Sequence, residues 1–144
     1  MVTSANFLGD YEPQGAILIQ AAKTAAAITK GDVCDSTGGQ WRTAPAGTGA
    51  GHYAVCTESA TASDSTVQLL LRGLVYVTAD SSITANGMLI ISPSTAGQVV
   101  STATAVITTY VGKYLYHENE GDGSTVPTSA VDGDVIKIDF RGVL

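Results

Sequence analysis

The stretch Val67-Gln-Leu-Leu-Leu-Arg-Gly73 returns near the end of the chain as Ile136-Lys-Ile-Asp-Phe-Arg-Gly142. In both stretches every second residue is apolar, and an Arg-Gly pair follows in the same register. Because side chains alternate between the two faces of a strand, each stretch predicts a β-strand with one apolar face. A glycine after each arginine is typical of a bulge or a sharp bend at the corner of a barrel.

Further matches link the two halves of the chain in the same order. Ile28-Thr-Lys-Gly-Asp-Val33 is echoed by Ile83-Thr-Ala-Asn-Gly-Met-Leu89, and Gly51-His-Tyr53 is echoed by Gly112-Lys-Tyr114. The spacing between a stretch and its echo grows steadily along the chain and is largest for the two Arg-Gly pairs. Loop insertions in a second copy, chiefly in residues 118–132, produce a spacing that grows in one direction.

These matches predict an all-β fold in which residues 16–73 and 74–142 are two tandem copies of a five-strand unit. Each copy has a half-exposed apolar face, so the two are expected to bury these faces together in a single small β-barrel or sandwich-like domain, residues 16–144. The alternative is that a chain rich in glycine, threonine and valine produces such echoes by chance. Residues 21–27 are too few for a stable helix, and we interpret them as a connector.

The composition excludes several classes of function. Alanine, threonine, glycine and serine make up 65 of the 144 residues, only 14% are charged, and the net charge is −6. Seven Lys and Arg residues in an acidic chain do not provide the basic surface that nucleic-acid binding needs. No apolar run approaches the ~20 residues of a membrane-spanning helix, and no basic residue precedes Lys23. Neither a membrane partner nor a secretory signal is therefore predicted.

No stretch of the sequence predicts a catalytic, cofactor or metal site. His52 and His117 have no carboxylate or cysteine partner at a fixed spacing. The glycine-rich residues 47–51 lack the Gly-Lys-Ser/Thr ending of a phosphate-binding loop. Residues 118–123 look like the start of a calcium loop, but the twelfth position is Ser129, where that loop needs glutamate. We predict a protein that is not an enzyme and has no cofactor.

The first fifteen residues precede the first copy and are expected to form an extended N-terminal arm, residues 1–15. Phe7, Leu8 and Tyr11 stand there among polar residues. An arm this short cannot form its own core, so it is either a frayed terminus or a segment that adds to a neighbouring chain. In the second case its apolar side chains are candidate contacts with another subunit.

Two further side chains are candidate contacts. Trp41 is most simply explained by packing in the core or at the barrel rim, and alternatively as an interface anchor. Leu70 corresponds to Asp139 in the second copy, so it is expected to point outward and to be covered by another subunit. Cys34 and Cys56 are interpreted as small buried apolar residues, and the sequence does not decide whether they form a disulfide.

Four stretches resemble, in this order, the small capsid-cement (head-decoration) proteins of tailed phages, formerly catalogued as a domain of unknown function. They are Gly15-Ala-Ile-Leu-Ile-Gln-Ala-Ala22, Ile28-Thr-Lys-Gly-Asp-Val33, Gly112-Lys-Tyr-Leu115 and Gly133-Asp-Val-Ile-Lys-Ile-Asp-Phe-Arg-Gly-Val143, together with a Gly-Gln turn. The resemblance covers most of residues 15–144 and rests on pattern, small-residue composition and the end of the chain. The loop 118–132 departs from the compact form of that family.

The resemblance implies a β-barrel-like protein that is made in the host cytoplasm and forms a homotrimer on the outer surface of an icosahedral capsid. Its partners are then other copies of itself and the major capsid protein, whose neighbouring subunits it clamps, and no active site is implied. Two alternatives remain. One is another virion module, such as a tail-tube, head-fibre or adhesin part that binds a protein or glycan. The other is a small β-barrel enzyme with His52 or His117 beside carboxylates in a cleft.

Overall fold

The computed structural model describes residues 7–48, 52–84, 87–104, 108–117 and 129–142, which form nine strands and no helix. The strands are β1 (Ile17–Lys23), β2 (Val33–Thr37), β3 (Gln40–Thr43), β4 (Tyr53–Cys56), β5 (Thr66–Thr78), β6 (Met88–Ile91), β7 (Val99–Thr102), β8 (Tyr110–His117) and β9 (Val135–Arg141). The predicted all-β fold is confirmed. None of the described segments is a helix long and apolar enough to cross a membrane.

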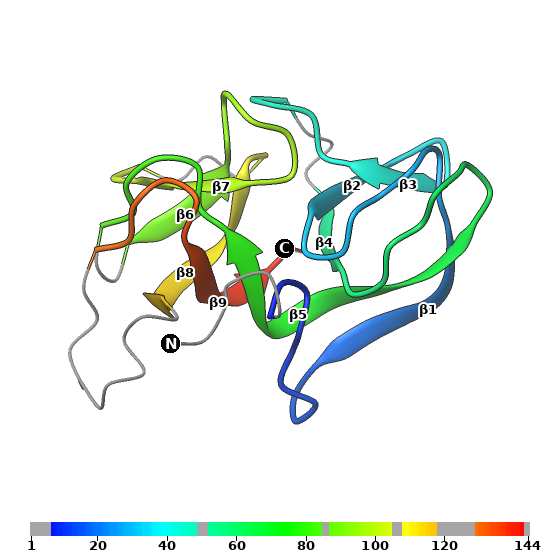
Figure 1. The fold of residues 1–144 in the computed structure, drawn as a ribbon, viewed down its shortest axis with the longest axis horizontal. Helices are drawn as coiled ribbons and strands as arrows, with labels where there is room; N and C mark the ends of the chain where they lie inside the picture. The colour runs from blue at the N-terminus through cyan, green and yellow to red at the C-terminus, as the bar shows by residue number, and fades with distance from the viewer. Residues whose placement is uncertain (1–6, 49–51, 85–86, 105–107, 118–128, 143–144) are drawn as a thin grey trace.

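The thirteen-residue strand β5 belongs to two five-strand units that lie side by side (Figure 1). In unit 1, β1 pairs with the first half of β5, which pairs with β4, then β2, then β3. In unit 2, the second half of β5 pairs with β9, then β8, β6 and β7. The two pairing orders are the same, and every ladder is antiparallel. The strands of residues 16–73 and 74–142 are thus arranged alike.

Each unit curls until the end of its first strand meets the strand at the other end of the pairing order, which is β3 in unit 1 and β7 in unit 2. Thr24, just after β1, forms a parallel bridge with Trp41 of β3. Ala79, just after β5, forms a parallel bridge with Val99 of β7. Because the two bridges occupy corresponding places, both units have the same barrel-like form.

A second pair of bridges shows where the two units differ in length. Ile28 and Ala60 exchange two backbone hydrogen bonds, with N···O distances of 2.9 and 2.8 Å. Ile83 and Ala130 exchange the same two, at 2.9 and 3.0 Å. The two alanines are further apart in the sequence than the two isoleucines. The extra length of unit 2 therefore lies mainly before Ala130, in a segment that includes residues 118–128, which are outside the described residues.

One of the expected matches between the copies is wrong by three positions. The N–H of Cys56 donates to the carbonyl of Asp32, and the N–H of Tyr114 donates to the carbonyl of Gly87, both at 3.0 Å. The step along the sequence from Asp32 to Gly87 equals the step from Ile28 to Ile83. Tyr114 therefore corresponds to Cys56 and not to Tyr53, and the shared Gly-x-Tyr letters are coincidental.

The interior of unit 1 is one apolar cluster, against which Ile19, Trp41 and Leu71 pack. Its buried members are Ala22, Ile28, Cys34, Ala54, Cys56, Ala60, Val67 and Leu69. A second, larger cluster fills unit 2 and continues into unit 1 through Val33, Ala44, Tyr53, Val55 and Leu70. The outer face of unit 1 is therefore buried against unit 2. The two copies bury apolar surface against each other, as predicted, through this shared cluster.

The turn between β6 and β7 joins unit 2 to unit 1. The N–H of Val33 donates to the carbonyl of Gly97 at 2.9 Å, and the N–H of Gly97 donates to the carbonyl of Ala44 at 3.0 Å. Gly97 has a φ of +76°, and a Cβ there would lie 2.8 Å from Cγ2 of Thr43 and 3.0 Å from Cγ of Asp32. Glycine is needed at this position because both the backbone and the space require it.

Two strand boundaries differ from the sequence prediction. The predicted border between the copies, after Gly73, lies inside the single strand β5, because Gly73 accommodates the bend between the units with a φ of +137°. A Cβ at Gly73 would lie 3.2 Å from Cα of Ala16. Residues 21–23, interpreted as part of a connector, belong to β1, since pairing with β5 continues to Lys23.

Candidate interaction surfaces

The N-terminal arm pairs with the second half of β5 as a short additional strand. The N–H of Gly9 donates to the carbonyl of Tyr76 at 3.0 Å, and the N–H of Tyr76 donates to the carbonyl of Asp10 at 3.1 Å. The N–H of Glu12 donates to the carbonyl of Leu74 at 3.0 Å. The arm thus satisfies the backbone groups on the edge of β5 that β9 leaves free.

Side chains of the arm attach it to unit 2. The ring of Phe7 lies 5.4 Å from the ring of Tyr76, centroid to centroid. Glu12 forms an ion pair with Lys137, whose Nζ lies 5.5 Å from the centroid of the Tyr76 ring. Tyr11 packs against the large apolar cluster. Aromatic, ionic and apolar contacts therefore together hold residues 7–12 against unit 2.

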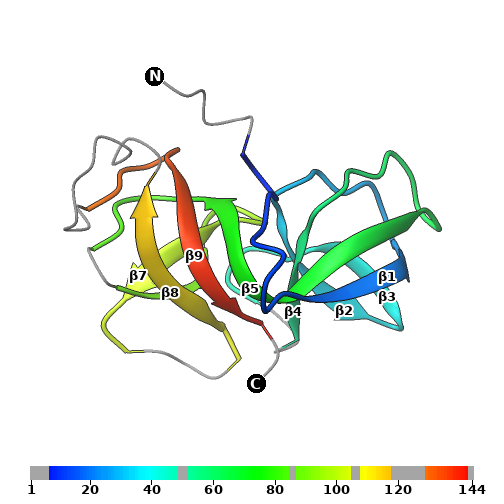
Figure 2. The ribbon, with the colours of Figure 1, turned by 90° about the horizontal axis from the view of Figure 1, so that it is seen from below.

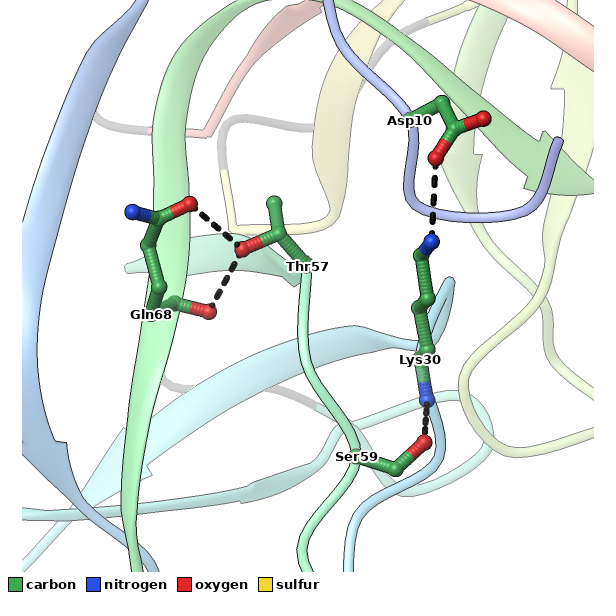
Figure 3. Close-up of polar contacts among 5 residues, drawn as sticks. All are labelled: Asp10, Lys30, Thr57, Ser59 and Gln68. Atoms are coloured by element: carbon green, nitrogen blue, oxygen red, sulfur yellow. Dashed lines mark hydrogen bonds and ion pairs between the residues drawn. The ribbon is translucent and has the colours of Figure 1, made fainter.

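The arm also contacts unit 1, as Figure 2 shows where the dark blue segment passes between the units. Nζ of Lys30 lies 2.9 Å from Oδ1 of Asp10, and the N–H of Lys30 donates to Oγ of Ser59 at 2.8 Å (Figure 3). At Gly9, a Cβ would lie 2.8 Å from the carbonyl oxygen of Cys56. The arm is thus held against both units at their junction.

The three candidate contacts of the arm lie against their own chain. Phe7, Leu8 and Tyr11 are each half-buried. Leu8 covers Gly31, where a Cβ would come within 2.8 Å of the Leu8 Cβ. Residues 7–12 are therefore not a frayed terminus, and their contact with another subunit stays a prediction. Residues 1–6 lie outside the described residues.

Trp41 is half-buried at the rim of unit 1, where it packs against the interior cluster. Its carbonyl accepts a hydrogen bond from the N–H of Ala25 at 2.7 Å. Its environment is the rim packing expected from the sequence, and a role as an interface anchor stays a prediction.

Leu70 corrects an expectation. It pairs with Val55 of β4 in the register that pairs Asp139 with Lys113 in unit 2, so the predicted equivalence with Asp139 holds. It does point away from the interior of unit 1, but its exposed fraction is 0% because unit 2 covers it. The covering surface comes from the same chain, and the expectation of a subunit contact at Leu70 is wrong.

The two cysteines are free thiols inside unit 1. Cys34 and Cys56 are hydrogen-bonded to each other, and this contact, followed by burial, raises the pKa of Cys34 well above its ordinary value. The thiol of Cys34 also donates to the carbonyl of Asp32 at 3.5 Å. A protonated, buried thiol is a poor nucleophile, so Cys34 acts as a core residue. The same hydrogen bond lowers the pKa of Cys56.

An ion pair between a buried carboxylate on β2 and a partly exposed arginine on β3 was not predicted from the sequence. The Asp35 carboxylate has no exposed surface, and Nε of Arg42 lies 2.9 Å from its Oδ1. This contact raises the pKa of Arg42. Asp35 and Arg42 lie directly opposite each other on the two strands. The ion pair could therefore be predicted only from the β2–β3 register, which the sequence alone does not give.

The outward edge of β1 is a candidate surface for a partner. Among the described residues, β1 has β5 as its paired strand, lies near β3, and is followed by Thr24, which bridges Trp41 of β3. In Figure 1, β1 is the outermost strand of unit 1. Ile17, its first residue, is 50% exposed. An exposed strand edge of this kind is a template for adding another strand.

No family model and no curated protein matches the chain. Within the described part of the chain, no group of three or more His, Cys, Asp and Glu side chains is placed to hold a metal ion. Among the described residues, the features suited to binding a partner are the arm and the outward edge of β1.

Proposed function

We propose that this chain is a structural virion protein that decorates and stabilises the outer surface of a viral capsid. Bound there as a homotrimer, it clamps neighbouring subunits of the major capsid protein. The observation that carries the proposal is the duplicated barrel-like body. It agrees with the fold implied by the resemblance to phage capsid-cement proteins, and its two units share one strand and one apolar cluster.

Two properties of the described surface support this proposal. A strand edge whose first six residues carry no charge, and the large exposed apolar side chains of Ile17 and Met88, provide area for binding another protein. The arm, the shared strand and the docked turn around Gly97 hold the two units together. A clamp has to hold two attachment points at a fixed separation, and two units joined in this way do so.

The experiment is reconstitution on capsids that lack the protein. Purified chain is added to expanded capsids of the source virus, which are then sedimented and heated. Binding at a copy number near that of the major capsid protein, with a higher temperature of capsid disruption, is the expected result. A folded chain that does not sediment with such capsids contradicts the proposal.

Mass spectrometry of purified virions gives an independent readout. Decoration predicts a copy number close to that of the major capsid protein. A few copies per particle, together with hexamers or polymers in sedimentation of the free chain, favours the alternative of a tail-tube, head-fibre or adhesin module.

A further inference from the structure

We infer that the outward edge of β1 accepts an extended segment of a different protein, which adds to unit 1 as an antiparallel strand. The inference starts from the equivalence of β1 with the second half of β5. Leu18 pairs with Leu70, and Leu74 pairs with Asp139, the residue that corresponds to Leu70. Leu18 therefore occupies in unit 1 the place that Leu74 occupies in unit 2.

The equivalent edge in unit 2 is already filled by an added strand. The carbonyls of Leu74 and Tyr76 accept hydrogen bonds from the arm, and the N–H of Tyr76 donates to it. By the equivalence above, Leu18 corresponds to Leu74. Tyr76 corresponds to Gln20 and Ala21 together, because the register shift between Ile19 and Ala22 places two residues of β1 opposite one residue of β5. Within the described ranges no hydrogen-bonded strand covers this part of β1. The chain thus contains one edge that binds an extended segment and, at the equivalent place in unit 1, a second edge that carries a register shift.

The sequence of β1 does little to protect this edge. Its first six residues, Ile-Leu-Ile-Gln-Ala-Ala, carry no charge and no proline, and the charge of Lys23 comes only at its end. Besides Lys23, the register shifts against β5 are the protective feature seen in β1. Soluble proteins usually protect exposed edges with charged residues or proline, so this edge is suited to pairing with a partner.

The pairing of the arm bears on which partner this is. In this structure residues 9–12 are already paired with β5 of their own chain. Among the described residues no other extended segment is left to fill the edge of β1, so the segment comes from another polypeptide. Pairing of β1 with β1 of a second copy is the competing outcome, and sedimentation of the free chain distinguishes it. Only the identification of the partner as the capsid shell protein depends on the proposed function; the edge itself does not.

The test uses the full chain, capsids that lack it and a matched pair of variants. Ile17→Lys places a charge on the edge, and Val131→Lys places the same charge on a side chain that is 58% exposed and lies in unit 2. Both variants are expected to keep the wild-type thermal midpoint. Ile17→Lys should bind capsids at least tenfold more weakly than the wild type, and Val131→Lys within twofold of it.

Hydrogen exchange followed by mass spectrometry locates the contact. Residues 16–23 should exchange faster in the free chain than residues 74–78, and should become protected on the capsid. Equal capsid binding by wild type and Ile17→Lys overturns the inference and leaves the proposed function standing. A free chain that sediments as a dimer, with residues 16–23 already protected, overturns it in favour of self-pairing.

If the wild type does not bind capsids, the proposed function fails and the edge is tested with a peptide. The probe is acetylated Phe-Leu-Gly-Asp-Tyr-Glu amide, the sequence of residues 7–12, titrated to millimolar concentration into labelled full chain. Shifts of the backbone amide resonances of residues 17–22 support the inference. No shifts, or shifts confined to residues 74–78, overturn it.

Discussion

Cys56 of β4 and Tyr114 of β8 occupy the same position in the two units. The N–H of Cys56 donates to the carbonyl of Asp32, and the N–H of Tyr114 donates to the carbonyl of Gly87, both at 3.0 Å. Asp32 and Gly87 each stand just before the second strand of their unit. One backbone frame therefore holds a small thiol in unit 1 and a large phenol in unit 2. The interiors of the two units are packed differently around the same hydrogen bonds.

This difference predicts unequal costs for truncating equivalent core residues. Leu89 and Cys34 correspond to each other, and both are fully buried. Leu89→Ala should lower the free energy of unfolding by about 2–5 kcal/mol. Cys34→Ala should lower it by about 1 kcal/mol, because only a sulfur atom is removed. Urea unfolding of the two variants checks this, and equal losses would contradict the assignment of the two sites.

Leu70 and Asp139 give a reciprocal test of which unit covers the other. Leu70→Asp should lower the free energy of unfolding by roughly 4 kcal/mol or more, because the carboxylate is sealed between the units without a partner. Asp139→Leu should leave stability close to that of the wild type, because it removes only a partly exposed ion pair with Arg141. Urea unfolding measures both, and a stable, folded Leu70→Asp variant would show that Leu70 faces solvent.

The strands and the duplication could be predicted from the sequence because they depend on local patterns. Alternation of apolar residues placed β5 and β9, and the matches around Ile28 and Arg72 have the spacings that the structure shows. The match at Tyr53 failed because two shared residues, a glycine and a tyrosine, carry less information than a hydrogen-bond register. The ion pair of Asp35 could not be predicted either, because it depends on which residue of β3 lies opposite Asp35.

The environments of the candidate contacts could not be predicted, because burial depends on how distant segments pack. The position of Leu70 on its strand was predicted correctly, but no local pattern shows that unit 2 covers that face. Phe7 likewise gives no sequence signal for its partner Tyr76, which lies far along the chain. In both cases, residues expected to contact another molecule contact their own chain.

Docking of the arm predicts different effects of alanine at two glycines. Gly9 and Gly15 both have a positive φ, +76° and +79°, so alanine at either should cost about 1–2 kcal/mol of backbone strain. Only at Gly9 does the added Cβ meet other atoms, the nearest being Cγ of Lys30 at 2.7 Å. Gly9→Ala should therefore also displace the arm and expose the amide of Tyr76 to hydrogen exchange.

Gly15→Ala is the matched control for that experiment, because a Cβ there has nothing within 4 Å. It should reproduce the small loss of stability while the Tyr76 amide stays protected. If both variants leave that amide protected, the arm does not depend on the close contact at Gly9.

Asp32 predicts a pH dependence of stability. Burial raises the pKa of its carboxyl above the ordinary value of 3.8, although hydrogen bonds from Thr43 and Thr29 oppose this. The folded state then binds the proton more tightly than the unfolded state. The resulting stabilisation is complete below the ordinary pKa and is lost as pH rises through the raised value.

Asp32→Asn removes this titration and keeps an oxygen that can accept the hydrogen bonds from Thr43 and Thr29. Relative to the wild type, the variant should therefore gain stability between pH 3.5 and pH 7. Thermal midpoints of both proteins at the two pH values measure the change. A difference that is the same at both would show that the carboxyl does not titrate with folding.

The shared strand β5 also determines how the molecule carries force. The two units are joined by an unbroken polypeptide, and β5 is paired lengthwise with β1 in one unit and with β9 in the other. Tension along β5 loads each ladder in shear, so many backbone hydrogen bonds resist together, whereas peeling would break them one at a time. A protein of this build acts as a mechanical tie, strongest along the line from Thr66 to Thr78.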